Sequence, residues 1–370
     1  MQAGAAGAPP KPEEARPSSA TRSRRPQARP PSGMGSESGA LVPARPSGGG
    51  NDALFLSSSL RMARPQWARL QERLACWSSG RWARARSRGV WEWLPAERAG
   101  CVRLPRLSRG SLCAALRGRS VLVVGDSLSR QMHMAILGLM EGEGRGAARA
   151  RCPWRLSGVP CGGHAICRGG ARRARARQRL LFRRSDWLRP NATAPFSFSW
   201  GANLVEEPWR ADAASGAWGV LLLNRGAHLQ AEDGAFREGW RAALAAARAA
   251  APGALIVARN TPPGHAGCAR ARQPLTRRTP PPPPPHSPHG WHHFPRQNEV
   301  LRALLRKDFP GVLLLDVAAP TAGRPDMHLG SAGKSKDCLH YHLGPGSPLE
   351  HWVRLLAAVL KLAQSMAEKN

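Results

Sequence analysis

One short run of the sequence, Gly125-Asp-Ser-Leu-Ser-Arg130, combines a turn residue with a serine. It follows the apolar run 121–124, which is typical of a buried strand, and precedes apolar residues at helical spacing. Gly125 permits a tight turn, and Ser127 then stands at a helix N-terminus, where free N–H groups and the helix dipole favour an oxyanion. Such a placement is typical of a serine nucleophile, although Asp and Ser are also ordinary helix caps.

A serine nucleophile needs a base, and the base needs an orienting group. The run Asp337-Cys-Leu-His340 offers both, because on a turn the Asp337 carboxylate can accept a hydrogen bond from the His340 imidazole. The other ring nitrogen can then face the serine. A surface turn could also carry this spacing by chance, so the two motifs together indicate serine chemistry more strongly than either one alone.

Strands and helices alternate along the chain. We expect strands at 121–124, 218–224, 255–259 and 312–317, and helices at 127–140, 236–250, 297–307 and 347–363. This alternation predicts an α/β fold, a three-layer sandwich with a mainly parallel central sheet covered by helices on both faces.

The composition divides the chain into three parts. Residues 1–60 are rich in Pro, Gly, Ser and Arg, and we expect a disordered low-complexity tail. Residues 61–118 form a small N-terminal segment rich in Cys and Trp, and residues 119–365 form the catalytic domain, with insertions near 141–190 and 268–295. Neither a signal peptide nor a membrane anchor is visible, since no apolar run reaches about 18 residues.

The chain carries 55 Lys and Arg against 24 Asp and Glu, a formal net charge of +31. Nearly all the basic residues are Arg, alongside much Ala, Gly and Pro, so we interpret the excess as a solvated surface property and expect no nucleic-acid partner. Eight cysteines, an even number, suggest an oxidising compartment, with reduced buried cysteines as the alternative. No zinc-site spacing occurs, the histidines near 286–293 fit a solvated loop, and we expect no metal.

Seven blocks of sequence resemble the trichome birefringence-like (TBL) family of polysaccharide O-acetyltransferases, in the PC-esterase branch of SGNH/GDSL-like folds. The resemblance extends from Cys76 to about Leu360. The matching blocks are Cys76-Trp-Ser-Ser-Gly-Arg-Trp82, Trp91-Glu-Trp-Leu-Pro95, Gly125-Asp-Ser-Leu-Ser-Arg130, Asn224-Arg-Gly-Ala-His228, Arg259-Asn-Thr-Pro-Pro-Gly-His265, Leu315-Asp-Val317 leading into Arg324-Pro-Asp-Met-His328, and Asp337-Cys-Leu-His340.

The resemblance implies an SGNH-hydrolase-like fold with a catalytic triad of Ser127, His340 and Asp337. It also implies an O-acetyltransferase that moves an acetyl group through an acyl-serine onto hydroxyls of a cell-wall polysaccharide or glycan. The implied partners are an acetyl donor and a glycan acceptor, without a dissociable cofactor, and the implied location is the Golgi or secretory pathway.

Further matched positions are candidates for binding. Gly125 shapes the turn, while the Ser127 N–H and the Asn224 side chain are candidate oxyanion donors. Arg130 could anchor the loop that carries His340 or contact a donor. Three residues that follow strands, where ligands of open α/β sheets collect, are expected to line the acceptor groove: His228, Arg259 and His265.

The chain departs from the family after His340, where His340-Tyr-His-Leu-Gly-Pro-Gly346 replaces the usual His-Trp-Cys-Leu-Pro-Gly. One family cysteine is therefore missing, and Cys268 with Cys338 remains a plausible bridge. Three other functions stay open: a carbohydrate acetylesterase with the same triad, a non-catalytic glycan-binding protein, and a nucleic-acid binder centred on 172–184.

Overall fold

The computed structural model describes most of the chain after residue 54. The described residues are 55–57, 60–62, 64–85, 90–96, 101, 104, 106–141, 161–167, 178–193, 196–199, 203–229, 232–275, 288–331 and 335–368. Residues 52–370 form one compact unit, and the expected tail lies almost entirely outside the described residues.

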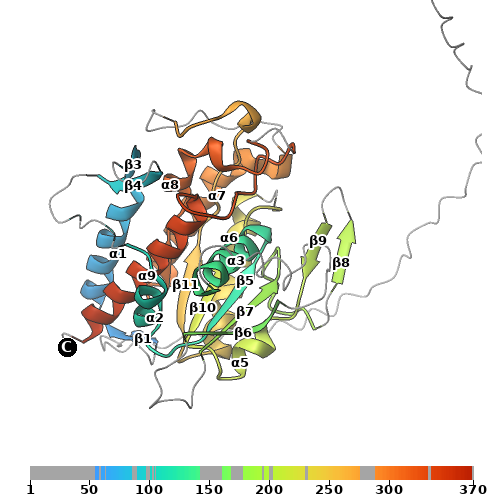
Figure 1. Ribbon diagram of the computed structural model, residues 1–370. Coiled ribbons are helices and arrows are strands. Elements are labelled where there is room, and N and C mark those ends of the chain that lie inside the picture. The colour runs from blue at the N-terminus through green and yellow to red at the C-terminus, as the bar shows by residue number, and fades with distance from the viewer. Residues whose placement is uncertain are drawn as a thin grey trace, which may run out of the picture. The chain divides into compact units, whose positions relative to one another are not determined.

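A central sheet organises this unit (Figure 1). Its strand order is β12 (Leu313–Leu315), β11 (Leu255–Arg259), β10 (Val220–Asn224), β5 (Val121–Gly125), β7 (Gln178–Arg184) and β6 (Cys161–Ile166). All neighbours are parallel except β6, which runs antiparallel to β7 at the edge. Every residue of β5, β10 and β11 is buried, which explains why these strands read as continuous apolar runs.

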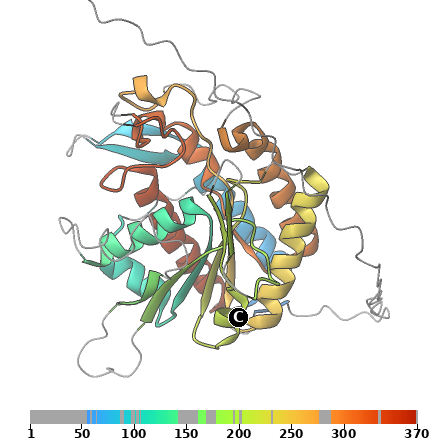
Figure 2. The same ribbon diagram turned by 90° about the vertical axis from the view of Figure 1, so that its right-hand side faces the viewer.

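Helices cover both faces of the sheet, as Figures 1 and 2 show. One face carries α1 (Arg64–Ser78), α2 (Arg109–Leu116), α3 (Ser127–Glu141) and α9 (Pro348–Ala367). The other carries α5 (Arg210–Ala214), α6 (Asp233–Ala250) and α7 (Phe294–Asp308). The predicted α/β class with a mainly parallel sheet is therefore confirmed.

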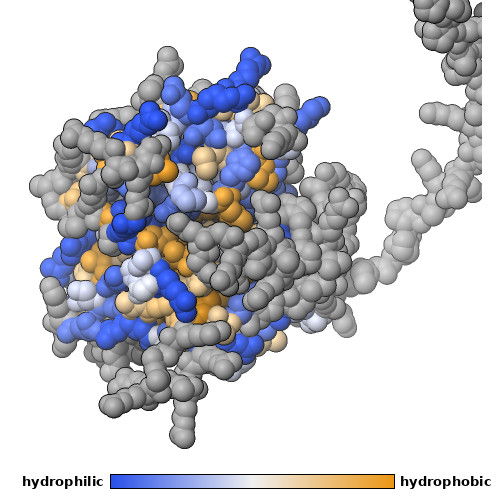
Figure 3. All heavy atoms as spheres, in the orientation of Figure 1, coloured by the Kyte–Doolittle hydropathy of each residue, from blue (hydrophilic) through white to orange (hydrophobic). Residues whose placement is uncertain are grey.

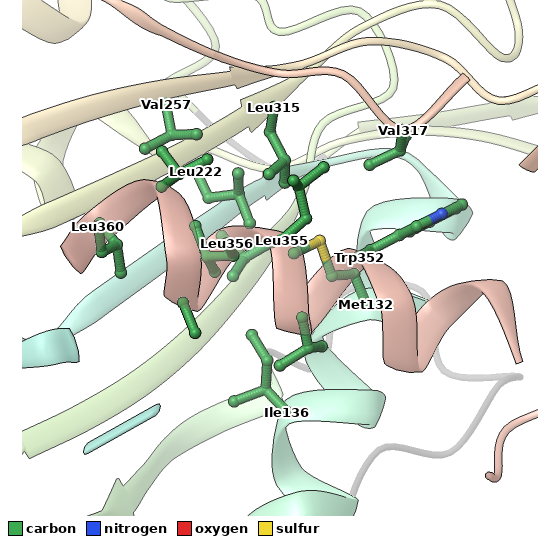
Figure 4. Close-up of a cluster of buried hydrophobic side chains, with 14 of the residues drawn as sticks. Met132, Ile136, Leu222, Val257, Leu315, Val317, Trp352, Leu355, Leu356 and Leu360 are labelled. Carbon is green, nitrogen blue, oxygen red and sulfur yellow. The ribbon is translucent and has the colours of Figure 1, made fainter. Parts of the chain in front are cut away.

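The last helix supplies much of the core on its face of the sheet (Figure 4). The Ser347 hydroxyl accepts a hydrogen bond from the Glu350 N–H at its start, and Pro348 occupies the first turn. Trp352 and Leu356 of α9 are 0–1% exposed and pack in one cluster with Met132 of α3. Each buried side chain of this size contributes about 1.5–3 kcal/mol, so the sheet, α3 and α9 form one rigid support.

The Cys- and Trp-rich segment packs against the main domain. Two hairpins, β1 (Phe55–Ser57) with β2 (Leu60–Met62) and β3 (Gly80–Arg84) with β4 (Trp91–Pro95), flank α1. The indole of Trp82 donates to the Pro320 carbonyl at 2.7 Å, in the short helix α8 (Ala318–Ala322). This segment belongs to the same compact unit as the sheet, and its first described strand, β1, lies within the range 1–60 that we expected to be a tail.

The expectation that residues 141–190 form an insertion outside the sheet is wrong for two strands. Both β6 and β7 belong to the sheet, and β7 pairs in parallel with β5. The apolar part of β7 is only Leu180-Leu-Phe182, and arginines on both sides hide it in the sequence. Residues 142–160 and 168–177 of this region lie outside the described residues. A further hairpin joins β8 (Phe196–Ser199) to β9 (Asn203–Glu206).

Three disulfides occur in the described residues: Cys76–Cys101, Cys113–Cys167 and Cys268–Cys338. The last is the bridge that the family resemblance leaves plausible. Disulfides fit a protein that folds in an oxidising compartment. Among the described helices, none combines the length and apolar character needed to cross a membrane.

The arginine excess is partly neutralised by ion pairs. Arg183 contacts Asp212 at 2.6 Å, Arg241 contacts Asp308 at 2.7 Å, and Arg302 contacts Asp316 at 2.7 Å. The face in Figure 3 shows hydrophilic side chains interspersed with apolar areas.

Two buried histidines should make the protein sensitive to acid. Burial first, then the charges of His164 and Arg130, lower the pKa of His133 to about 3. Between the ordinary pKa of about 6.5 and this value, only the unfolded chain binds the proton, so stability falls by about 1.4 kcal/mol per pH unit as pH decreases. We expect His133→Leu to flatten the pH dependence of the unfolding free energy by about this slope between about pH 6 and pH 4, measured by urea denaturation.

His351→Leu is the matched variant, because burial also lowers the pKa of His351 to about 3. A similar flattening is expected there. An unchanged slope in both variants would contradict this assignment of the acid sensitivity.

Candidate active site

The site lies at the topological switch point of the sheet, at the carboxyl end of β5. The strand β5 has β7 on one side and β10 on the other, so chain segments that follow these strands diverge at its carboxyl end. Ligands of open α/β sheets bind in the crevice at such a point. The turn from β5 into α3, which carries Ser127, occupies this position.

Glycine is required at the turn before the serine. Gly125 has a φ of +156°, and a Cβ there would lie 2.4 Å from the Ser129 hydroxyl oxygen and 2.9 Å from the Asn224 carbonyl oxygen. The Asp126 Oδ1 atom accepts hydrogen bonds from the N–H groups of Leu128 at 3.0 Å and Ser129 at 3.1 Å. Asp126 therefore caps α3 and fixes the turn.

The structure brings Ser127, His340 and Asp337 together although they come from opposite ends of the domain. The Ser127 hydroxyl donates to His340 Nε2 at 2.7 Å, and His340 Nδ1–H donates to Asp337 Oδ2 at 2.8 Å. The carboxylate can only accept, so it selects the tautomer whose Nε2 lone pair faces the serine. This is the geometry of an activated serine nucleophile.

The second carboxylate oxygen of Asp337 is also engaged. It accepts the backbone N–H groups of His340 at 3.0 Å and Leu339 at 3.1 Å. Burial alone raises the pKa of Asp337, but the hydrogen bond and charge of His340 and these two N–H groups outweigh it and hold the pKa well below its usual range. Asp337 therefore stays ionised and keeps His340 oriented.

The loop that carries the base is anchored to the helix that carries the serine, through a residue that the sequence reasoning did not identify. Gln131 donates from Nε2 to the Tyr341 carbonyl at 2.8 Å and accepts the Tyr341 N–H at 3.1 Å. We expected Arg130 to have an anchoring or donor-binding role, yet this two-way anchor belongs to its neighbour. The available signal was the position of Gln131 four residues after Ser127, on the same helix face.

Arg130 lies buried in the first turn of α3, and burial, followed by the charge of Arg184, lowers its pKa. His228 lies near the triad, because His340 and Asp126 both act on its titration; burial, the largest cause, lowers its pKa to about 4. His228 is therefore neutral at physiological pH, and its predicted place in an acceptor groove stays a prediction.

Two predicted groove residues have different roles. The expectation that Arg259 lines an acceptor groove is wrong, because its side chain is 0% exposed and pairs with Asp126 at 3.3 Å. Burial lowers its pKa to about 10, which leaves it charged. His265, expected in the same groove, is instead hydrogen-bonded between His328 and the Ala322 carbonyl.

Asn224 is buried beside the turn. Its Nδ2 atom donates to the Arg259 carbonyl at 3.0 Å, and its Oδ1 atom lies 3.5 Å from the Ser129 hydroxyl. These contacts make Asn224 a link between strand ends β10 and β11. Its predicted part in an oxyanion site stays a prediction, beside the Ser127 N–H at the start of α3.

The arrangement can perform acyl transfer through serine. His340 can take the Ser127 proton as the hydroxyl attacks a carbonyl, and the N–H groups at the start of α3 are candidate donors to the negative charge that develops. In the part of the chain that the structure describes, no cluster of His, Cys, Asp and Glu could hold a metal ion.

The anchor provided by Gln131 can be tested directly. In Gln131→Leu the buried N–H and carbonyl of Tyr341 lose their partners, which costs about 1–3 kcal/mol each and loosens His340. We expect kcat for aryl acetate cleavage to fall about tenfold or more with little change in KM. Gln364→Leu is the control, since Gln364 is another buried glutamine that donates to a backbone carbonyl, that of Ala115, but lies far along α9. Equal kcat losses in both variants would contradict a specific role for Gln131.

Neither a protein-family model nor a curated protein matches the chain. Among solved structures, the chain is similar to one described as "Peptidoglycan O-acetylesterase in action, 5 min", with 11% identity and a TM-score of 0.30. The match covers 44% of this chain and 41% of that chain, so it spans less than half of that protein's length. A likeness of this size is too small to assign an activity, and the geometry around Ser127 remains the basis for doing so.

Proposed function

We propose that the protein is a polysaccharide O-acetyltransferase of the TBL/PC-esterase kind, with an SGNH-like catalytic domain. The observation that supports this most directly is the continuous hydrogen-bonded path from the Ser127 hydroxyl through His340 to Asp337, at 2.7 and 2.8 Å. The resemblance of the seven sequence blocks to the TBL family is the basis for proposing acetyl as the transferred group and a glycan as the acceptor.

In the first half-reaction, the Ser127 oxygen attacks the carbonyl carbon of an acetyl donor while its proton moves to His340 Nε2. The tetrahedral oxyanion collapses, the donor's leaving group departs with the proton from His340, and acetyl-Ser127 remains. Asp337 stabilises the imidazolium that forms between these steps and does not itself take the proton.

In the second half-reaction, a sugar hydroxyl gives its proton to His340 and attacks the acetyl-serine. The acetyl group becomes an ester of the glycan, and the proton returns to Ser127. Our proposal places this chemistry in the secretory pathway, with a cell-wall polysaccharide or other glycan as acceptor and no metal or dissociable cofactor.

The second candidate is a carbohydrate acetylesterase, in which water replaces the sugar hydroxyl. One observation favours it: the Asp337 side chain is 30% exposed, so solvent reaches the acid end of the triad. Transfer requires that the bound acceptor outcompete this water.

The decisive experiment follows the acetyl group by mass spectrometry. The full chain is incubated with an aryl acetate and a panel of neutral and uronate polysaccharides. Trypsin releases the peptide 120–130, which contains Ser120, Ser127 and Ser129, so fragmentation of the peptide must locate the acetyl group. We expect the acetyl group on Ser127 and then on a glycan, and a loss of activity on the order of 1,000-fold or more in Ser127→Ala.

Ser129→Ala is the matched variant, because Ser129 lies two residues away on the same turn. It should still form acetyl-Ser127. Donor cleavage that yields acetate but no acetylated sugar would establish the esterase instead. The absence of any acyl-serine would exclude both enzymes and leave a glycan-binding protein.

A further inference from the structure

Two buried histidines connect the loop of the base to the loop that follows β11. His265 Nδ1 lies 2.7 Å from His328 Nε2. At the outer ends, His265 Nε2 lies 2.8 Å from the Ala322 carbonyl oxygen, and His328 Nδ1 lies 3.1 Å from the carbonyl oxygen of His340. The chain of contacts thus ends on the backbone of the proposed general base.

Counting protons shows that this chain of three contacts exceeds what two neutral imidazoles can make. A carbonyl only accepts, so each outer contact needs an N–H on the histidine. The inner contact between two ring nitrogens needs a third proton. Two neutral rings carry two protons together, so one of the three contacts must then lack its hydrogen.

We propose that His265 and His328 are positioning residues for His340, and that one proton taken up between their rings supplies the hydrogen that is missing from the three contacts. His328 is the nearer member: its Nδ1–H donates to the His340 carbonyl, and its ring stacks on Tyr341 with centroids 4.2 Å apart. The inference rests on the proposed function only in taking His340 as the base.

The surrounding contacts show that this support joins segments that are already tethered. The disulfide Cys268–Cys338 links the same two loops, and the Tyr341 hydroxyl donates to the Pro263 carbonyl at 2.7 Å. The backbone N–H of His265 donates to the Cys338 carbonyl at 3.0 Å. The covalent and backbone ties hold the loops together, so the histidine pair can change its proton count without their separation.

Charged groups around the pair set the direction of its titration. Asp326 faces His265 and is itself paired with Arg324, while Asp337 and His340 face His328. Burial lowers the pKa of His265, and burial followed by the charge of His265 lowers that of His328 to about 3. At neutral pH the pair therefore holds two protons. The contact between His265 Nε2 and the Ala322 carbonyl can then lack its hydrogen, while His328 Nδ1–H still donates to the His340 carbonyl. The third proton binds as pH falls.

The proton count can be read without any enzymatic assay. Histidine ¹⁵N NMR of the full chain, and of Ser127→Ala, should show the two rings taking up one shared proton in a single step as the solution is acidified. Burial lowers the pKa of the pair, so acidification favours opening of these loops. Amide exchange at Leu329 and His342, which hydrogen-bond across the base loop, should therefore speed up as pH falls and level off once the pair has taken up its proton, after correction for intrinsic exchange. Independent titration of the two rings, or no uptake before unfolding, would overturn the shared proton.

Two variants separate positioning from general stability. His328→Phe keeps a ring against Tyr341 but removes one of the two donors to the His340 carbonyl, the other being the Leu329 N–H at 2.9 Å, and we expect kcat to fall about tenfold with KM nearly unchanged. His265→Phe removes one of the two titrating rings and should weaken the pH dependence of exchange at Leu329 and His342. His351→Phe replaces a buried histidine outside the base loop and should leave kcat unchanged.

An unaltered kcat in His328→Phe would overturn the positioning role. If instead Ser127→Ala retains full activity while the ¹⁵N titration behaves as expected, the proposed function fails and the histidine pair stands.

Discussion

The active-site end of the fold depends on one buried ion pair, between Asp126 and Arg259. Both side chains are 0% exposed, so each charge is tolerated only because the other is present. Arg259 also donates to the Ser129 hydroxyl at 2.9 Å and lies 5.1 Å from the ring centre of Trp352. The pair therefore ties the turn after β5 to the end of β11 and to α9, and a misplaced strand would leave a charge buried alone.

The two halves of the triad are held in different ways. Ser127 sits on a turn clamped by Gly125, Asp126 and the core behind it, where very little can move. His340 sits on a loop, and its position comes from several separate contacts: Gln131, the Cys268–Cys338 disulfide and His328. Such separate contacts keep the imidazole of His340 in place beside Ser127. This is required of a base that takes part in two successive proton transfers.

Much of the fold could be predicted from the sequence because the central strands β5, β10 and β11 consist mostly of consecutive apolar residues. The strand 255–259 agrees with β11 in both ends, and the N-cap Ser347 marks the start of α9. The strand β7 was missed because three apolar residues among arginines look like a basic surface segment. The two motifs pointed to Ser127, Asp337 and His340, since the first lies directly between β5 and α3 and the second precedes α9 in the chain.

The surroundings of the triad were harder to predict. Position after a strand indicates which edge of the sheet a residue occupies, but not whether its side chain faces solvent or core. Arg259 and His265 both follow β11 as expected, yet one is buried in an ion pair and the other in a histidine pair. Partners such as Gln131 and His328 act through backbone groups of distant residues, and such contacts leave no local pattern in the sequence.

The distance between the serine and its base along the chain also has a consequence for biosynthesis. The two residues are 213 positions apart, and the sheet and α9 must close around them before they can meet. A ribosome-bound chain that has exposed Ser127 still lacks His340 and Asp337, so the hydrogen-bonded triad cannot yet form. The triad is complete only after the C-terminal part of the domain has been synthesised and has folded, so acylation of Ser127 would indicate that the whole domain is correctly folded.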